Sequence, residues 1–109
     1  MQRVWLMLTI FIVGIMVLPA CAASSEPVPE IDATALYTDN CASCHGANRS
    51  DSSPVAPPLN PQRLATLSDS EVKGTILNGR PGTAMAAFKS SLSSEEVGAL
   101  LQLIKYTAP

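Results

Sequence analysis

The amino-acid sequence predicts an all-α fold, and three observations indicate this class. Residues 68–71 and 93–96 each read Ser-x-x-Glu, the pattern of a helix capping box. The second stretch is followed by apolar residues at helical spacing, which form a single stripe: Val97, Leu100, Leu101 and Ile104. The alternation of apolar and polar residues that marks a half-buried strand does not flank the cysteine motif near residue 41.

Local signals predict two helices in the first half of the chain. Asp32 is the cap of a first helix that runs toward residue 41. One face of this helix carries apolar residues four positions apart: Ala33, Tyr37 and Cys41. A short helix begins with Asn60 as its cap and Pro61 at its first position, and it runs through Leu64.

Two further helices follow the capping boxes. Ser68 caps a helix in which Val72 and Ile76 share one face, and Gly79 ends it. Ser93 caps the last predicted helix, which carries the apolar stripe. Leu92 and Val97 lie on either side of that cap at the spacing of a hydrophobic staple.

Residues 1–20 differ from the rest of the chain. Residues 4–18 form an apolar run after Arg3, and this run is shorter than the ~20 apolar residues that cross a bilayer. Its length is typical of a secretory signal, so residues 1–20 are predicted to be a signal peptide. The stretch Leu18-Pro19-Ala20-Cys21 resembles the processing site of a bacterial lipoprotein, in which Cys21 becomes the lipidated first residue.

Ordinary cleavage after Ala22 or Ala23 and an uncleaved anchor are the alternatives. All three place the folded part outside the cytoplasm, as a membrane-anchored lipoprotein facing the periplasm or cell exterior or as a secreted protein. Residues 21–31 contain two prolines and no apolar periodicity, which predicts a flexible tether. Residues 32–109 are then the single folded domain.

Composition limits the function classes. The chain has 109 residues and a formal net charge of −2, so it lacks the basic surface that nucleic-acid binding requires. Residues 32–109 are few for a self-sufficient core, and domains of this size commonly depend on a disulfide, a metal or another group.

The motif Cys41-Ala42-Ser43-Cys44-His45 predicts what completes this core. C-x-x-C-H is the signature of covalent c-type haem attachment. On one helical turn Cys41, Cys44 and His45 address the same flat ligand: the two thiols bond to the haem vinyl groups and the imidazole ligates iron.

Three alternatives explain the motif less well. A disulfide between Cys41 and Cys44 leaves His45 without a role and closes a very short loop. A thioredoxin-like redox pair requires a βαβ context, for which the sequence gives no strand signal. Zinc requires a fourth ligand, and the only other Cys or His in the chain is Cys21.

Met85 is the predicted second axial ligand of the iron. The other methionines lie in residues 1–20, and His45 is the single histidine of the chain, so two-sided coordination by the usual haem ligands requires His45 with Met85. Met85 also lies in a turn-rich segment, residues 78–88, that can carry the sulfur to the far side of the ring. The alternative is that Met85 only fills the core.

These residues together resemble a small bacterial class I cytochrome c with one haem, over residues 32–107. The resemblance implies three to five helices around one covalently attached haem c. It also implies that the first and last helices cross beside the haem, so that Tyr37 would meet Leu100. Ala56-Pro57-Pro58-Leu59 is similar to a family segment whose carbonyl, that of Pro57 here, accepts the Nδ1 hydrogen of the haem histidine.

One residue departs from the family pattern. Ala86 follows Met85 where the family usually has proline, which removes a backbone restraint from the ligand loop. Arg80, in the same loop, is either a partner of a haem propionate or a solvated residue.

Coordination predicts the function class. With His45 and Met85 on the iron no site is open to a substrate, so we expect an electron carrier rather than an enzyme. Its partners would be redox proteins, together with the membrane through a lipid on Cys21. The alternatives are a haem domain with Met85 unbound, active in peroxidase-like or gas-binding chemistry, and a fixed electron-entry subunit of a larger oxidoreductase.

Overall fold

The computed structural model describes residues 29–51 and 53–109. The predictions for residues 1–20, for Cys21 and for most of the tether therefore lie outside the described residues. Within the described ranges no helix is long and apolar enough to cross a membrane.

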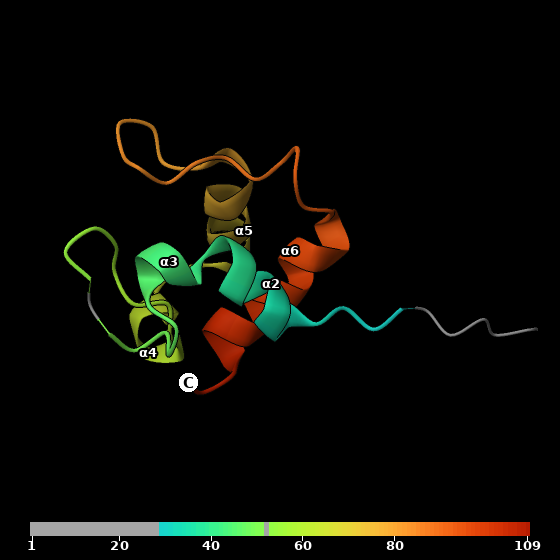
Figure 1. Ribbon diagram of the computed structural model, residues 1–109, viewed down its shortest axis with the longest axis horizontal. Coiled ribbons are helices and arrows are strands. Elements are labelled where there is room, and N and C mark those ends of the chain that lie inside the picture. Colours follow the sequence, from blue (N-terminus) through green and yellow to red (C-terminus); the bar gives the residue numbers. More distant parts are fainter. Residues whose placement is uncertain (1–28, 52) are drawn as a thin grey trace, which may run out of the picture.

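The described chain is built from helices, without strands, which confirms the predicted fold class (Figure 1). In chain order the helices are α2 (Ala33–Asn40), α3 (Ala42–His45), α4 (Pro61–Leu64), α5 (Asp69–Asn78), α6 (Ser94–Leu101) and the π-helix η1 (Gln102–Tyr106).

The predicted helix caps are present. Asp32 caps α2, where its Oδ1 accepts the N–H groups of Thr34 and Ala35 at 3.0 and 2.9 Å. Asn60 caps α4 by accepting the N–H of Arg63 at 2.9 Å, and proline stands at the start of that helix. Each cap satisfies backbone donors that have no partner inside the helix.

Both capping boxes form. The N–H of Ser68 donates to Glu71 Oε2 at 2.7 Å, and the Ser68 hydroxyl accepts the N–H of Glu71 at 3.3 Å. Ser93 and Glu96 make the same pair of bonds in α6, at 2.7 and 3.2 Å. Gly79 follows the last residue of α5 with a φ of +67°, a backbone conformation that favours glycine.

Two helices differ from their predicted extent. The first helix stops at Asn40, because Cys41 leaves the helical conformation (φ −122°) and a separate turn, α3, begins after it. The last predicted helix is α-helical only to Leu101 and continues as the π-helix η1. The apolar stripe nevertheless keeps facing the core through Ile104, which is 3% exposed.

The core lies where α6 packs against α2 and α5, and where η1 packs against α4. Its buried side chains are Tyr37, Leu64, Val72, Ile76, Val97, Leu100, Leu101 and Ile104. All four residues of the predicted stripe belong to this cluster. The packing of α2 on α6 confirms the expected crossing of the first and last helices.

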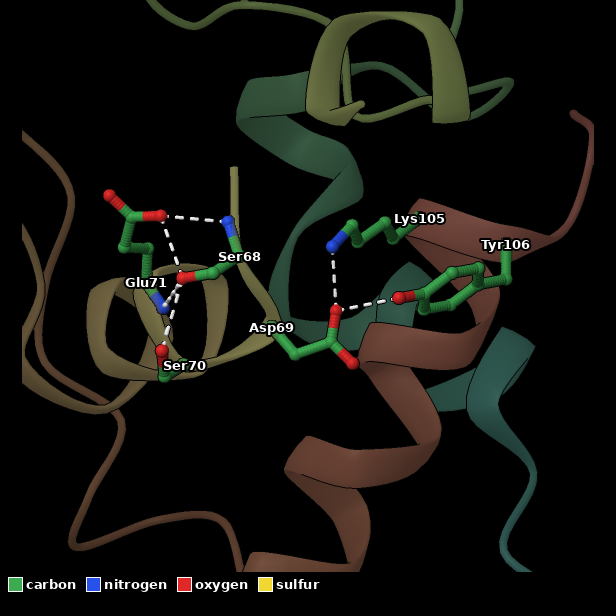
Figure 2. A network of polar contacts seen from close by, with 6 residues as sticks. All are labelled: Ser68, Asp69, Ser70, Glu71, Lys105 and Tyr106. Atoms are coloured by element: carbon green, nitrogen blue, oxygen red, sulfur yellow. Dashed lines mark hydrogen bonds and ion pairs between the residues drawn. The ribbon is translucent and has the colours of Figure 1, made fainter. Parts of the chain in front are cut away.

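A polar network joins the start of α5 to η1 (Figure 2). One carboxylate oxygen of Asp69 accepts both the Lys105 ammonium and the Tyr106 hydroxyl, each at 2.6 Å. The hydrogen bond from Lys105, followed by that from Tyr106, lowers the pKa of Asp69 below its ordinary value. The ion pair raises the pKa of Lys105 in return.

This network predicts a pH-dependent contribution to stability. A carboxyl group whose pKa is lowered by folding stabilises the fold above its unfolded-state pKa, about 3.9, and stops doing so as the pH falls through the folded-state value. We expect Asp69→Asn to lower the melting temperature of the haem-loaded protein at pH 7. The difference from the unsubstituted protein should shrink as the pH falls below about 3.9 and through the lower folded-state pKa of Asp69.

Thermal melts of both proteins across this range measure the effect. Asp51→Asn is the matched control, since that carboxylate accepts from the Asn48 side chain and takes no part in the ion pair of the described chain. A melting difference for Asp69→Asn that stays constant down to the lowest pH would show that the charge of Asp69 is irrelevant.

Candidate functional site

A cavity of about 440 Å³ opens between the helices, within the ~300–1,000 Å³ typical of ligand sites. The structure brings all the predicted cofactor-binding residues of the domain to its wall: Cys41, Cys44, His45, Pro57 and Met85. They come from the α3 turn, from the loop before α4 and from the loop after α5. In Figure 1 the loop after α5 runs above α3 in the view.

The cysteine motif forms one helical turn, as predicted. The N–H groups of Cys44 and His45 both donate to the carbonyl oxygen of Cys41, at 3.1 and 2.9 Å. Both thiols are free; Cys41 is half-buried and Cys44 is exposed. The turn therefore presents two unpaired thiols and one imidazole to the cavity.

The environment of Cys41 argues against use of the motif as a redox pair. Burial, and then the neighbouring Cys44, raises the pKa of the Cys41 thiol to about 11. Redox-active C-x-x-C pairs work through a thiolate with a lowered pKa. Within residues 29–51 and 53–109 no three Cys, His, Asp or Glu side chains are grouped to hold a metal ion such as zinc.

The imidazole of His45 is oriented by a backbone carbonyl. Its Nδ1 lies 2.7 Å from the carbonyl oxygen of Pro57, the contact that the family resemblance implied. A carbonyl oxygen only accepts, so Nδ1 carries the hydrogen and Nε2 keeps a free lone pair for a metal. The side chain is also fixed by burial, since His45 is 8% exposed.

Tyr37 stabilises this turn through a hydrogen bond, a role that the sequence did not predict. Its hydroxyl donates to the carbonyl oxygen of Gly46 at 2.7 Å, immediately after His45. Burial is the main cause that raises the pKa of Tyr37 to about 12, so the hydroxyl remains a donor throughout the neutral range. The sequence placed Tyr37 on a helix face but contained no signal for this hydrogen bond.

Hydrogen bonds shape the loop that carries Met85. The N–H of Arg80 donates to the Met85 carbonyl and the N–H of Thr83 donates to the Arg80 carbonyl, both at 3.1 Å. The Thr83 hydroxyl donates to the Arg80 carbonyl at 2.8 Å and accepts the Met85 N–H at 3.2 Å. Past the methionine, the N–H of Phe88 donates to the carbonyl of Ile76 at 3.1 Å and returns the loop to α5.

Gly79 is needed for this loop as well as for ending α5. A Cβ atom on Gly79 would lie 2.6 Å from the Met85 carbonyl oxygen and 2.7 Å from the carbonyl carbon of Ala86. Both distances are shorter than van der Waals contact, and the atoms belong to backbone that cannot swing aside. The loop around Met85 can therefore approach the helix only because residue 79 has no side chain.

We expect Gly79→Ala to displace the segment that carries Met85. A non-glycine residue in the left-handed region costs about 1–3 kcal/mol, and the contact with Met85 adds to this cost. In the haem-loaded protein the substitution should weaken or remove the sulfur-to-iron charge-transfer absorption of the oxidised form.

Gly74→Ala is the matched control for this substitution. Gly74 lies inside α5, and a Cβ atom added there would meet nothing within 4 Å. Alanine at this position should therefore stabilise the helix by ~0.5–1 kcal/mol and leave the absorption unchanged. An unchanged charge-transfer band in Gly79→Ala would contradict the role given to Gly79.

The rest of the cavity is apolar, with a few basic residues. Helices α4, α5, α6 and η1 contribute buried aliphatic residues to its wall: Leu64, Val72, Ile76, Leu100 and Ile104. The charged residues along the described wall are Arg63 and Arg80, and no carboxylate lines it. This lining suits a large apolar ring that carries acidic substituents.

The donor set fits a covalently attached haem. Two free thiols and an imidazole with an available Nε2 stand on one helical turn, and a thioether from a separate loop shares the same apolar cavity. These are the groups that attach haem c and ligate its iron in Met/His sites.

Comparisons with known proteins also indicate a c-type cytochrome. Residues 31–104 match the family described as cytochrome C oxidase, cbb3-type, subunit III. Dihydro-heme d1 dehydrogenase of Pseudomonas aeruginosa is 39% identical over 80 residues, which are 73% of this chain but 16% of that protein. The chain thus spans a small part of that relative's length.

Small cytochromes match over most of their own length. Cytochrome c55X of Stutzerimonas stutzeri is 30% identical over 82 residues, which cover 73% of this chain and 71% of the relative. The solved structure of the c-type cytochrome NirC superposes with a TM-score of 0.62 at 29% identity, over 71% of this chain and 91% of that one. The chain therefore belongs to the family of small c-type cytochrome domains to which subunit III of cbb3-type cytochrome oxidase also belongs.

Proposed function

We propose that this protein is an electron carrier with one haem c, which Cys41 and Cys44 would bind covalently and whose iron His45 and Met85 would ligate. Membership of the c-type cytochrome family implies covalent haem c and electron transfer. The observation that carries the residue assignment is the shared cavity, which is lined by both thiols, the imidazole and the single methionine of the described chain.

Bound haem supplies an iron that gains and loses one electron. The chain determines how that iron behaves. With both His45 and Met85 as ligands, the iron would have no position left for oxygen, peroxide or another substrate. The methionine sulfur and the aliphatic wall both favour the reduced state, because a soft neutral ligand and a low-dielectric surrounding disfavour the more highly charged iron.

Electron exchange would occur where the site reaches the surface. Cys44 is exposed, as are Val55 and Ala84 on the described rim of the cavity, and Val55 is 71% exposed. A redox partner that covers this rim approaches the haem edge through small apolar side chains. Such contacts are typically brief and bury less than ~1,200 Å² in total.

We further propose that residues 1–20 are a lipoprotein signal and that Cys21 becomes lipidated, so that residues 21–31 connect the domain to a membrane surface outside the cytoplasm. Such a connection would raise the effective concentration of the carrier near membrane-bound partners. Mass spectrometry of the mature protein from the membrane fraction tests this, because a diacylglycerol on Cys21, simple cleavage and an uncleaved chain each give a different mass.

The absorption spectrum of the oxidised haem-loaded protein tests the proposed carrier function. A low-spin spectrum with a sulfur-to-iron charge-transfer band is expected, because it requires methionine on the iron. A high-spin five-coordinate spectrum would instead indicate an unbound Met85 and peroxidase-like or gas-binding chemistry.

A fixed electron-entry subunit of a larger oxidoreductase is the second candidate. The matched family is named for an oxidase subunit, and one relative is a dehydrogenase of which this chain matches 16%. Copurification from a mild detergent extract distinguishes the two: a stoichiometric oxidoreductase partner favours the subunit, and a monodisperse single chain favours the free carrier.

A further inference from the structure

Arg49 is a buried arginine just beyond the haem-binding turn, and none of the assignments above uses it. The residue is 7% exposed, although arginine is almost never buried without a partner. One guanidinium nitrogen, Nη1, donates to the carbonyl oxygens of Leu103 and, at 3.0 Å, Thr107; Nη2 donates to that of Ala108 at 2.8 Å. The ion pair found in the described part of the chain joins Lys105 to Asp69, so backbone carbonyls alone satisfy Arg49.

The three carbonyls that Arg49 binds lie in η1 and in the two residues directly after it. The last turn of a helix has C=O groups without intrahelical partners, and its partial negative charge attracts a cation. Leu103 lies in η1, and Thr107 and Ala108 follow it directly. The planar fork of an arginine donates in several directions at once, which suits three converging carbonyls better than a single ammonium would.

The backbone of Arg49 adopts an unfavourable conformation, which the contacts of its side chain must offset. Its φ of +60° makes it the one non-glycine residue in the left-handed region among those described. Glycine or asparagine is expected at such a position, so an arginine there requires compensation from its contacts. The guanidinium bonds to residues more than fifty positions along the chain provide that compensation.

Arg49 closes a turn that begins next to the haem histidine. Its N–H donates to the carbonyl oxygen of Gly46 at 3.3 Å, the same oxygen that accepts the hydroxyl of Tyr37. Gly46 follows His45 directly. The segment after His45 is therefore joined to α2 through Tyr37 and to the end of η1 through Arg49.

We propose that Arg49 is a positioning residue for the haem site: by joining the turn after His45 to the end of η1, it fixes the orientation of the His45 ring. The proposal rests on the proposed function, because His45 must be the iron ligand for its orientation to matter. The contact from Nδ1 to Pro57 restrains one edge of the ring, and the Arg49 turn restrains the backbone to which the ring is attached.

The experiment compares Arg49→Gly, Arg49→Lys and Lys105→Gln with the unsubstituted haem-loaded protein. Arg49→Gly keeps the backbone conformation and removes only the side-chain bonds. Arg49→Lys retains a cation with fewer directions of donation. Lys105→Gln is the matched control, because it removes a different polar contact of η1, the one with Asp69.

Electron paramagnetic resonance of the oxidised protein and proton NMR of the His45 ring report the orientation of the imidazole. Arg49→Gly should shift the g values and the His45 ring resonances, or split them into two sets, while the charge-transfer band of Met85 remains. Arg49→Lys should give a smaller shift in the same direction. Lys105→Gln should lower the melting temperature and leave both spectra unchanged.

Unchanged g values and His45 resonances in Arg49→Gly would overturn the proposal, whatever its melting temperature. Equal shifts in Lys105→Gln would also overturn it, because any loosening of η1 would then have the same effect. If Arg49→Gly does not mature, Arg49→Lys decides: shifted spectra support the proposal and unshifted spectra reject it. Failure of the proposed function is recognised separately, since the unsubstituted protein would then lack the low-spin spectrum itself.

Discussion

Replacing Met85 with leucine should remove the sulfur-to-iron charge-transfer band of the oxidised protein and lower its reduction potential. Leucine fills a similar volume without a donor atom, so the substitution separates ligation from packing. Axial ligands set haem potentials over a range of ~0.8 V, and loss of the sulfur should cost an appreciable part of that range. The open position should also let the reduced protein bind carbon monoxide, which the unsubstituted protein should resist.

Two further variants make this result specific. Met85→His supplies a nitrogen donor, so we expect a low-spin spectrum without the charge-transfer band and a potential below that of the unsubstituted protein. Leu59→Ala truncates an apolar residue of the same cavity wall and should retain both the band and the resistance to carbon monoxide. If Met85→Leu keeps the original spectrum and potential, Met85 is core filler and the electron-carrier proposal loses its second ligand.

The sequence predicted the features that depend on neighbouring residues. Asp32, Asn60 and Ser68 cap helices because each side chain reaches backbone groups two or three positions away, and such contacts can be recognised in a short stretch of sequence. The buried stripe from Val97 to Ile104 follows from helical spacing alone. The turn at residues 41–45 was predictable because the spacing of its reactive groups is itself the signature.

Features that depend on distant residues were not predictable from the pattern. Gly79 was expected to end a helix, but the lack of room for a Cβ atom beside the Met85 carbonyl depends on how the loop returns to α5. The burial of Arg49 depends on carbonyls more than fifty residues away. The contact between His45 and Pro57 was expected only from the family resemblance, because two adjacent prolines equally suit a stiff loop.

These differences explain how the site is assembled. Short local patterns specify the helices and the identity of the reactive groups. The positions of those groups depend on contacts made by Gly79, Thr83 and Tyr37. In so small a domain the group that fills the cavity should contribute much of the free energy of unfolding. Loss of haem attachment is therefore the change with the largest expected effect.

Replacing both Cys41 and Cys44 with serine should abolish covalent haem attachment and, with it, cooperative folding. Without haem the aliphatic side chains that line the cavity of about 440 Å³ lose the ring against which they pack, and such a loss of core packing destabilises a fold. Domains are stable by only ~5–15 kcal/mol, so we expect this loss to remove the cooperative transition. The double variant should show no haem on a denaturing gel and no sharp thermal transition.

Graded controls test the cause of this loss. Cys41→Ser and Cys44→Ser alone each leave one thiol, so each should retain covalent haem and melt between the unsubstituted protein and the double variant. Ser43→Ala changes an exposed residue between the two cysteines and should mature normally, which shows that substitution in the turn is not itself harmful. A colourless double variant that still melts cooperatively would show that the helices form a complete core without haem. The cavity would then be an optional binding site rather than the centre of the fold.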